Sequence, residues 1–172
     1  RQAGLIPHFV AVEEIGLDNE GRFADADSFV IDALFKLYPY EDMLREDYSP
    51  YLPDAPIQLL EPPWKAVLSN KAILPLLWQM FPDHPNLLPS YFEGEADEAF
   101  LKGPHVRKPF FSREGANITV RSLGSEELST PGGYGAEGHI LQAYAEPPKF
   151  GDDYVMIGSW IIGGQASGIC LR

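Results

Sequence analysis

The chain has 172 residues and a net charge of −12, from 25 acidic and 13 basic residues. This length is enough to bury a core and is typical of one domain with one or two lobes. The acidic charge argues against nucleic acid and against an anionic membrane surface, since both bind basic proteins. A single cysteine, Cys170, excludes an internal disulfide and fits a reducing compartment. With no membrane-length apolar run and no signal peptide, the sequence predicts a soluble cytoplasmic protein.

The first sixty residues alternate short apolar runs with turns. Period-two and apolar patterns predict strands, and Met43 and Leu44 share one side of a predicted short helix. The strands are predicted at 8–12, 29–38 and 57–60, and the helix at 40–48. This order is typical of part of a mixed α/β layer.

The next region begins at a pair of prolines and contains the main predicted helix. Ser69 or Asn70 can cap a helix that runs to about Phe81. Its predicted buried stripe consists of Ile73, Leu74, Leu77 and Met80. Pro75 lies in the early turns, where a proline costs least, so we expect a kink. A strand at 86–92 and an acidic, solvated connection at 93–103 follow.

A loop with two cationic side chains then lies between two predicted strands. Pro109 cannot donate to a sheet ladder, so the first strand should end near Lys108. Gly115 and Asn117 tolerate positive φ, so the loop backbone can turn its N–H groups toward a bound anion. Lys108 supplies a mobile charge, and Arg113 a planar fork that matches two phosphate oxygens. By itself, this pattern fits a surface turn and a phosphate site about equally well.

The remainder of the chain has an antiparallel β pattern. Strands are predicted at 105–109, 117–122, 139–145, 154–162 and 166–172, and Gly163-Gly164 predicts a hairpin turn. Residues 133–138 match the spacing G-x-G-x-x-G of a dinucleotide site. That motif requires a preceding strand and a following helix, whereas here a turn-rich run precedes and a strand-like run follows. We therefore interpret residues 131–138 as a long mobile loop and not as a Rossmann phosphate turn.

Four stretches follow one another along the chain and carry a family resemblance. They are Leu68–Trp78 with Met80–Pro82 close behind, His84–Pro89, Lys108–Asn117, and Ile157–Trp160 leading to Gly168–Arg172. They resemble the glutathionylspermidine synthase family, a branch of the ATP-grasp ligases. Lys108–Asn117 is similar to the nucleotide loop of that family. The similarity extends over most of the chain from Glu61 to its end.

The resemblance implies a mixed α/β (α+β) fold of ATP-grasp type. Residues 1–60 would form part of a Rossmann-like pre-ATP-grasp or substrate lobe. Residues 61–172 would form the nucleotide-binding region, built on an antiparallel sheet. Because the chain starts at Arg1 without a methionine and stops directly after a strand-like run, we expect it to be part of a longer enzyme.

The resemblance also implies roles for individual cations. Lys71 and Lys108 would bind the phosphates of ATP, and Arg113, in the loop with Gly115, would cover the transferring phosphoryl group. Arg172 would approach the acyl-phosphate side. From residue type alone, Lys71 fits a surface lysine near a helix start, where the helix dipole disfavours a cation. Arg172 would similarly be only a terminal charge.

The segment Ile140–Tyr144 resembles the connection between the two ATP-grasp lobes, where adenine lies against backbone groups. Gln142, Ala143 and Tyr144 would therefore contact the nucleotide. The same residues also fit an ordinary half-buried strand. Four scattered histidines show no metal-site spacing, so no metal ligand is predicted within this chain. The Mg²⁺ ligands of such a ligase are expected upstream.

The implied reaction is ATP-dependent carboxylate–amine ligation. A glutathione-like peptide carboxylate would form an acyl phosphate, and a polyamine or another amine would displace the phosphate. The 172 residues alone are expected to be inactive. Two alternatives stay open from the sequence: a nucleotide-binding module without ligase activity, and a structural or interaction protein that retains only the fold.

Overall fold

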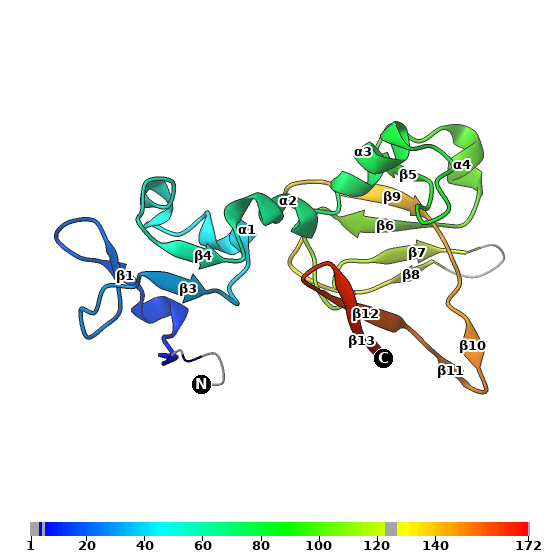
Figure 1. Ribbon diagram of the computed structural model, residues 1–172. Helices are drawn as coiled ribbons and strands as arrows, with labels where there is room; N and C mark the ends of the chain where they lie inside the picture. The colour runs from blue at the N-terminus through cyan, green and yellow to red at the C-terminus, as the bar shows by residue number, and fades with distance from the viewer. Residues whose placement is uncertain (1–3, 5, 123–126, 172) are drawn as a thin grey trace. The chain divides into compact units, whose positions relative to one another are not determined.

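The computed structural model describes residue 4, residues 6–122 and residues 127–171. It shows a mixed α/β fold with mostly antiparallel strands and few helices, which confirms the predicted fold class (Figure 1). The chain divides into two compact units, Arg1–Ile73 and Leu74–Arg172. No helix within these described ranges has the length and hydropathy needed to cross a membrane. The predicted functional division after residue 60 stays a prediction.

The first unit contains two small sheets and several short helices. β1 and β2 pair antiparallel, whereas β3 and β4 pair parallel, with Leu34 opposite Leu59. The chain between the parallel strands carries α1, as a parallel connection requires a crossover. Phe23, Tyr40 and Met43 are the largest side chains of its buried core. The elements are η1 (Val12–Glu14), β1 (Gly16–Leu17), β2 (Phe23–Ala24), β3 (Ala33–Phe35), α1 (Tyr40–Met43), η2 (Ser49–Tyr51), β4 (Gln58–Leu60), η3 (Pro63–Lys65) and α2 (Ala66–Ser69).

Three predicted elements of this unit differ from the structure. The predicted strand at 8–12 is wrong: Ile6 and Phe9 are almost fully exposed, and Val12 begins a 3-10 helix. The predicted helix at 40–48 ends at Met43, because the following backbone bonds close over three residues instead of four. The strand predicted at 29–38 is limited to Ala33–Phe35, apart from a single bridge at Val30.

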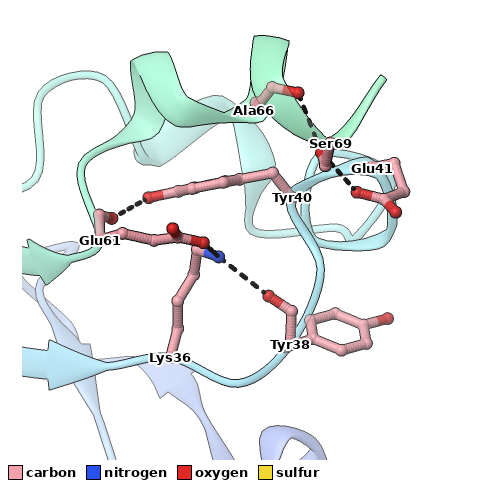
Figure 2. A network of polar contacts seen from close by, with 7 residues as sticks. All are labelled: Lys36, Tyr38, Tyr40, Glu41, Glu61, Ala66 and Ser69. Carbon is pink, nitrogen blue, oxygen red and sulfur yellow. Dashed lines mark hydrogen bonds and ion pairs between the residues drawn. The ribbon is translucent and has the colours of Figure 1, made fainter. Parts of the chain in front are cut away.

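A buried lysine joins the parallel strands to the first helix (Figure 2). The Lys36 side chain is 5% exposed, and its Nζ lies 3.4 Å from Glu61 Oε1 and donates to Tyr38 O at 3.3 Å. The ammonium group also lies 3.7 Å from the centre of the Tyr40 ring. Tyr40 Oη donates to Glu61 O at 2.6 Å, and burial raises the pKa of this phenol. A buried cation needs such partners, so these contacts fix the turn after β3.

The second unit is built on one five-stranded antiparallel sheet with the order β5-β9-β6-β7-β8 (Figure 1). β9 and β6 form its centre, and Val106, Ile140 and Leu141 are buried there. Two separate antiparallel pairs, β10–β11 and β12–β13, complete the unit. The elements are α3 (Ile73–Met80), β5 (Ser90–Phe92), α4 (Glu98–Lys102), β6 (His105–Pro109), β7 (Thr119–Arg121), β8 (Leu128–Ser129), β9 (His139–Ala143), β10 (Lys149–Phe150), β11 (Asp153–Tyr154), β12 (Ile157–Ile162) and β13 (Gln165–Leu171).

The predicted β pattern of this unit is largely confirmed. β6 has the predicted bounds and ends at Pro109. The turn between β12 and β13 uses Gly163 and Gly164 at φ 57° and 77°, as a two-residue hairpin with positive φ at both positions requires. β5, β7 and β9 are shorter than predicted, and the strand predicted at 154–162 is divided between β11 and β12.

The helix predicted from residue 69 or 70 to about residue 81 is confirmed as α3, which begins later, at Ile73, and a separate short helix, α2, ends at Ser69. Asn70 has an extended ψ of 118°, its side chain accepts from Ala72 N at 2.8 Å, and its carbonyl accepts from Ile73 N. Asn70 therefore caps the turn that separates α2 from α3, as short polar residues tend to do. Pro75 is the third residue of α3, where the first-turn N–H has no helical partner anyway. Met80, predicted to be buried, is 67% exposed.

The acidic segment predicted as a solvated connection contains helix α4. Asp97 caps its start, with Oδ1 accepting from Phe100 N at 2.8 Å. Phe100 packs edge-on against Tyr91 of β5, with ring centroids 4.7 Å apart. Its ring also lies against the His105 ring in a tilted arrangement, with centroids 5.6 Å apart. The helix is only five residues long, so its stability depends on this cap and on these aromatic contacts.

The capping role of Asp97 can be tested by substitution. Asp97→Ala removes the acceptor for the Phe100 N–H and is expected to lower the free energy of unfolding by about 1 kcal/mol, as measured by urea denaturation. Asp97→Asn keeps an oxygen acceptor at the same position and should stay close to wild type. Equal stability of the alanine variant and the wild type would contradict the role of the cap.

Candidate functional site

A pocket of about 490 Å³ lies between two loops of the second unit. One loop connects β6 to β7, and the other connects β8 to β9. The pocket is therefore attached to β6, β7, β8 and β9 of the sheet. Its lining residues are Arg113, Glu114, Gly115, Ala116, Thr130, Pro131 and Tyr134.

The first loop turns through a run of positive φ angles. Gly115 has φ 76° and Asn117 φ 54°, as the sequence predicts, and Glu114 also has φ 52°. The turn is closed by Ala116 N, which donates to Arg113 O at 3.0 Å. The sequence also predicts loop N–H groups directed at an anion. For two of them this is wrong, because the Ala116 and Asn117 N–H groups donate to backbone carbonyls.

The second loop is bonded to the first at several points. Thr130 Oγ1 donates to Gly115 O at 2.5 Å and accepts from Ile118 N at 2.9 Å. Asn117 Oδ1 accepts from Tyr134 N at 2.8 Å. Strand β9 follows this loop directly, so no helix opens from the glycine run, in agreement with the rejection of a Rossmann turn. The sequence interpretation as a mobile loop missed these bonds, which join residues 12–17 positions apart.

Lys108 lies in a polar cluster on one face of the sheet. Its Nζ donates to Gln142 Oε1 at 2.7 Å, and Gln142 Nε2 donates to Ser90 Oγ at 3.1 Å. Gln142 and Ser90 are both buried, and burial lowers the pKa of the Lys108 ammonium below its ordinary value. The cluster spans β5, β9 and β6, because Ser90 pairs with Gln142 and Lys108 with Ile140 in the sheet register.

Arg107 forms a second cluster with Glu93, in the turn after β5, and with His139 of β9, which the sequence did not predict. It lies next to Lys108 in β6 and therefore projects to the opposite face. Arg107 Nε donates to Glu93 Oε1 at 2.6 Å, and Nη2 lies 3.0 Å from His139 Nδ1. Hydrogen bonding from Arg107 holds the pKa of Glu93 below its usual value, while burial and then Arg107 lower the pKa of His139. The three residues are too far apart in sequence for a spacing rule to connect them.

The other predicted site residues lie in separate places. Ala143 N donates to Pro89 O at 2.8 Å and Tyr144 N to Pro104 O at 3.1 Å, so both N–H groups are bonded within the protein. Lys71 lies in the turn before α3 and belongs to the first unit. Arg172 lies outside the described residues. The structure thus brings Arg113 and Gly115 together in the pocket, and Lys108 together with Gln142.

No group of three or more His, Cys, Asp or Glu side chains in the described part of the chain is arranged to hold a metal ion. The Arg107 cluster contains only one carboxylate and one imidazole beside a guanidinium cation, which would repel a metal. The pocket lining has a single carboxylate, Glu114. These residues do not fit a Mg²⁺ site, which uses several oxygen ligands.

Comparison with known proteins gives a family match and several relatives. A family described as "Glutathionylspermidine synthase preATP-grasp" matches residues 1–172. A Haemophilus influenzae protein named "Putative acid--amine ligase" is 38% identical, over 99% of this chain and 45% of its own length. The trypanothione synthetase of Crithidia fasciculata is 31% identical over 99% of this chain and 24% of its length. The bifunctional glutathionylspermidine synthetase/amidase of Escherichia coli is 28% identical over 99% and 31%, respectively.

These relatives are named as a ligase and as synthetases. The chain belongs to the glutathionylspermidine synthase family, which confirms the resemblance seen in its sequence. It spans less than half the length of each of these relatives.

The environment of Lys108 can be measured directly. NMR titration of protein with isotope-labelled lysine side chains should give Lys108 a pKa below the value of about 10.4 for free lysine, because burial disfavours the charged form. Gln142→Leu removes the acceptor of the ammonium group and should lower this pKa further. A Lys108 pKa at or above the free-lysine value would show that the side chain is solvated.

Proposed function

We propose that this chain supplies nucleotide-phosphate contacts to an ATP-dependent carboxylate–amine ligase. The observation that carries the proposal is the pocket between the two loops, with Arg113 and Gly115 in its lining. Family membership supports it, since relatives are named as an acid–amine ligase and as synthetases. The pocket fits a phosphate group because a guanidinium fork can donate two hydrogen bonds to its oxygens.

The proposed reaction has two steps. A peptide carboxylate oxygen bonds to the γ-phosphorus of ATP, and the bond to ADP breaks, which gives an acyl phosphate. An amine nitrogen then bonds to the acyl carbon, inorganic phosphate leaves, and the nitrogen loses a proton to give the amide. The names of the relatives favour glutathione as the peptide and a polyamine such as spermidine as the amine.

Phosphoryl transfer asks little covalent chemistry of a protein, so its residues act by positioning and by charge. Lys108 would exchange part of its contact with Gln142 for a phosphate oxygen, because an anionic oxygen stabilises a buried ammonium group better than a neutral amide does. Arg113 would lie over the transferring phosphoryl group. Lys71 is proposed as a further phosphate ligand and Arg172 as a contact on the acyl side.

The nucleotide base is proposed to lie along Gln142, Ala143 and Tyr144. Two of their N–H groups are already bonded to protein carbonyls, so the base would use the remaining backbone groups of this segment. Mg²⁺ is expected to be held by residues of the full-length protein outside this chain. We accordingly expect the 172 residues alone to lack ligase activity.

The role of Lys108 is tested by ATP affinity. Lys108→Ala in the full-length protein should raise the dissociation constant of ATP at least about tenfold, because a charge-assisted contact is typically worth about 1.5–3 kcal/mol. Titration calorimetry provides the measurement. Lys102→Ala is the matched control, since this lysine is 78% exposed at the end of α4 and should not affect affinity. An unchanged affinity of the Lys108 variant would remove Lys108 from the site.

The role of Arg113 is tested by steady-state kinetics. Arg113→Lys keeps the charge but loses the two-pronged donor geometry. We expect kcat to fall at least about tenfold, a loss near 1.4 kcal/mol, with little change in KM for ATP, because the contact strengthens as charge develops during transfer. A normal kcat, or a defect confined to KM, would make Arg113 a binding residue only.

A further inference from the structure

The glycine-rich segment 131–138 does not have the strand-to-helix setting of a dinucleotide site, yet close packing explains three of its glycines. A Cβ atom on Gly132 would lie 2.3 Å from Asn117 Oδ1, and one on Gly135 would lie 2.7 Å from His139 Nε2. A Cβ atom on Gly138 would lie 2.9 Å from Phe110 Cε2. Real Cβ atoms essentially never show such separations. The glycines therefore allow the segment to approach its neighbours closely.

Asn117 connects the two loops through both its backbone and its side chain. Its φ of 54° turns the end of the first loop, and its N–H donates to Pro131 O at 3.4 Å. Its side-chain oxygen accepts from the Tyr134 N–H at 2.8 Å and lies in the space left by Gly132. Asn117 of the Arg113 loop thus bonds to the backbone of the other loop at two points, Pro131 and Tyr134.

The result is a pocket with two walls, which are joined at Thr130 and at Asn117. Arg113 and Gly115 lie on one wall, and Pro131 and Tyr134 on the other. Tyr134 is 45% exposed, although its backbone is held by the Asn117 bond. A tyrosine with a fixed backbone and an exposed side chain at a pocket wall can present its ring or hydroxyl to a ligand.

We propose that residues 131–138 form the second wall of the phosphate pocket, and that Asn117 is the positioning residue that couples it to the Arg113 loop. Arg113 and Tyr134 then act on one polyphosphate ligand. This inference rests on the proposed function for the identity of the ligand. The coupling of the two loops is a property of the protein without ligand, so it can be tested separately.

Two substitutions break the coupling from opposite sides. Asn117→Gly keeps access to positive φ but removes the side-chain acceptor. Gly132→Ala leaves Asn117 in place but puts a methyl group where its oxygen lies. Gly133→Ala is the matched control, because a Cβ atom there meets nothing within 4 Å and its φ is not in the left-handed region.

Hydrogen exchange of the ligand-free, full-length protein measures the coupling. We expect exchange of the Tyr134 amide to accelerate at least about tenfold in Asn117→Gly and in Gly132→Ala, and to be unchanged in Gly133→Ala. Thermal denaturation of each variant identifies a general loss of folding, which would accelerate exchange throughout the sheet as well. Unchanged exchange at Tyr134 in both coupling variants would overturn the coupling.

ATP titration and steady-state kinetics of the same variants measure how the coupling of the two loops affects ATP binding and catalysis. Both coupling variants should weaken ATP binding at least about fivefold and lower kcat, whereas Lys102→Ala, which lies outside both loops, should match wild type. Faster exchange at Tyr134 with unchanged ATP affinity and unchanged kcat would overturn the positioning role. If the wild-type protein binds no ATP, the proposed function fails and the ligand assignment fails with it, while the exchange data still decide the coupling.

Discussion

The antiparallel pairing of β6 with β9 is the constraint on which the candidate site depends. Its register sets Lys108 opposite Ile140 and Val106 opposite Gln142, so the ammonium of one strand reaches the amide of the other diagonally. A shift by one residue would send each side chain to the opposite face of the sheet. The same pairing ends at Pro109 and His139. The start of the loop after β6 and the end of the loop before β9 therefore lie side by side.

The sheet gives the neighbouring cations Arg107 and Lys108 different electrostatic surroundings in a strongly acidic chain. Arg107 is neutralised by Glu93, whereas Lys108, its neighbour on the other face, donates to the neutral amide of Gln142. The first cluster stabilises the sheet through charge-assisted hydrogen bonds. The second keeps an ammonium group partly desolvated, where an anionic ligand would be attracted more strongly than in water.

The sequence by itself determined the features that depend on local chemistry. Pro109 ends a strand because it has no N–H, and Gly163 with Gly164 makes a hairpin because both positions have positive φ. The loop conformation at Gly115 and Asn117 follows from the same tolerance of positive φ. The succession of apolar runs indicated a mixed α/β layer followed by antiparallel strands, and four stretches between residues 68 and 172 were sufficient for the family.

Only the tertiary structure decided how residues distant in sequence meet. Helix α4 was missed because Phe100 is stabilised by Tyr91 on a strand, and the Glu93–Arg107–His139 cluster was missed because it joins three elements. The second wall of the pocket depends on Asn117 bonding to Tyr134, 17 residues away. Such contacts form when the sheet register brings the loops together, and sequence patterns report on residues within a few positions of one another.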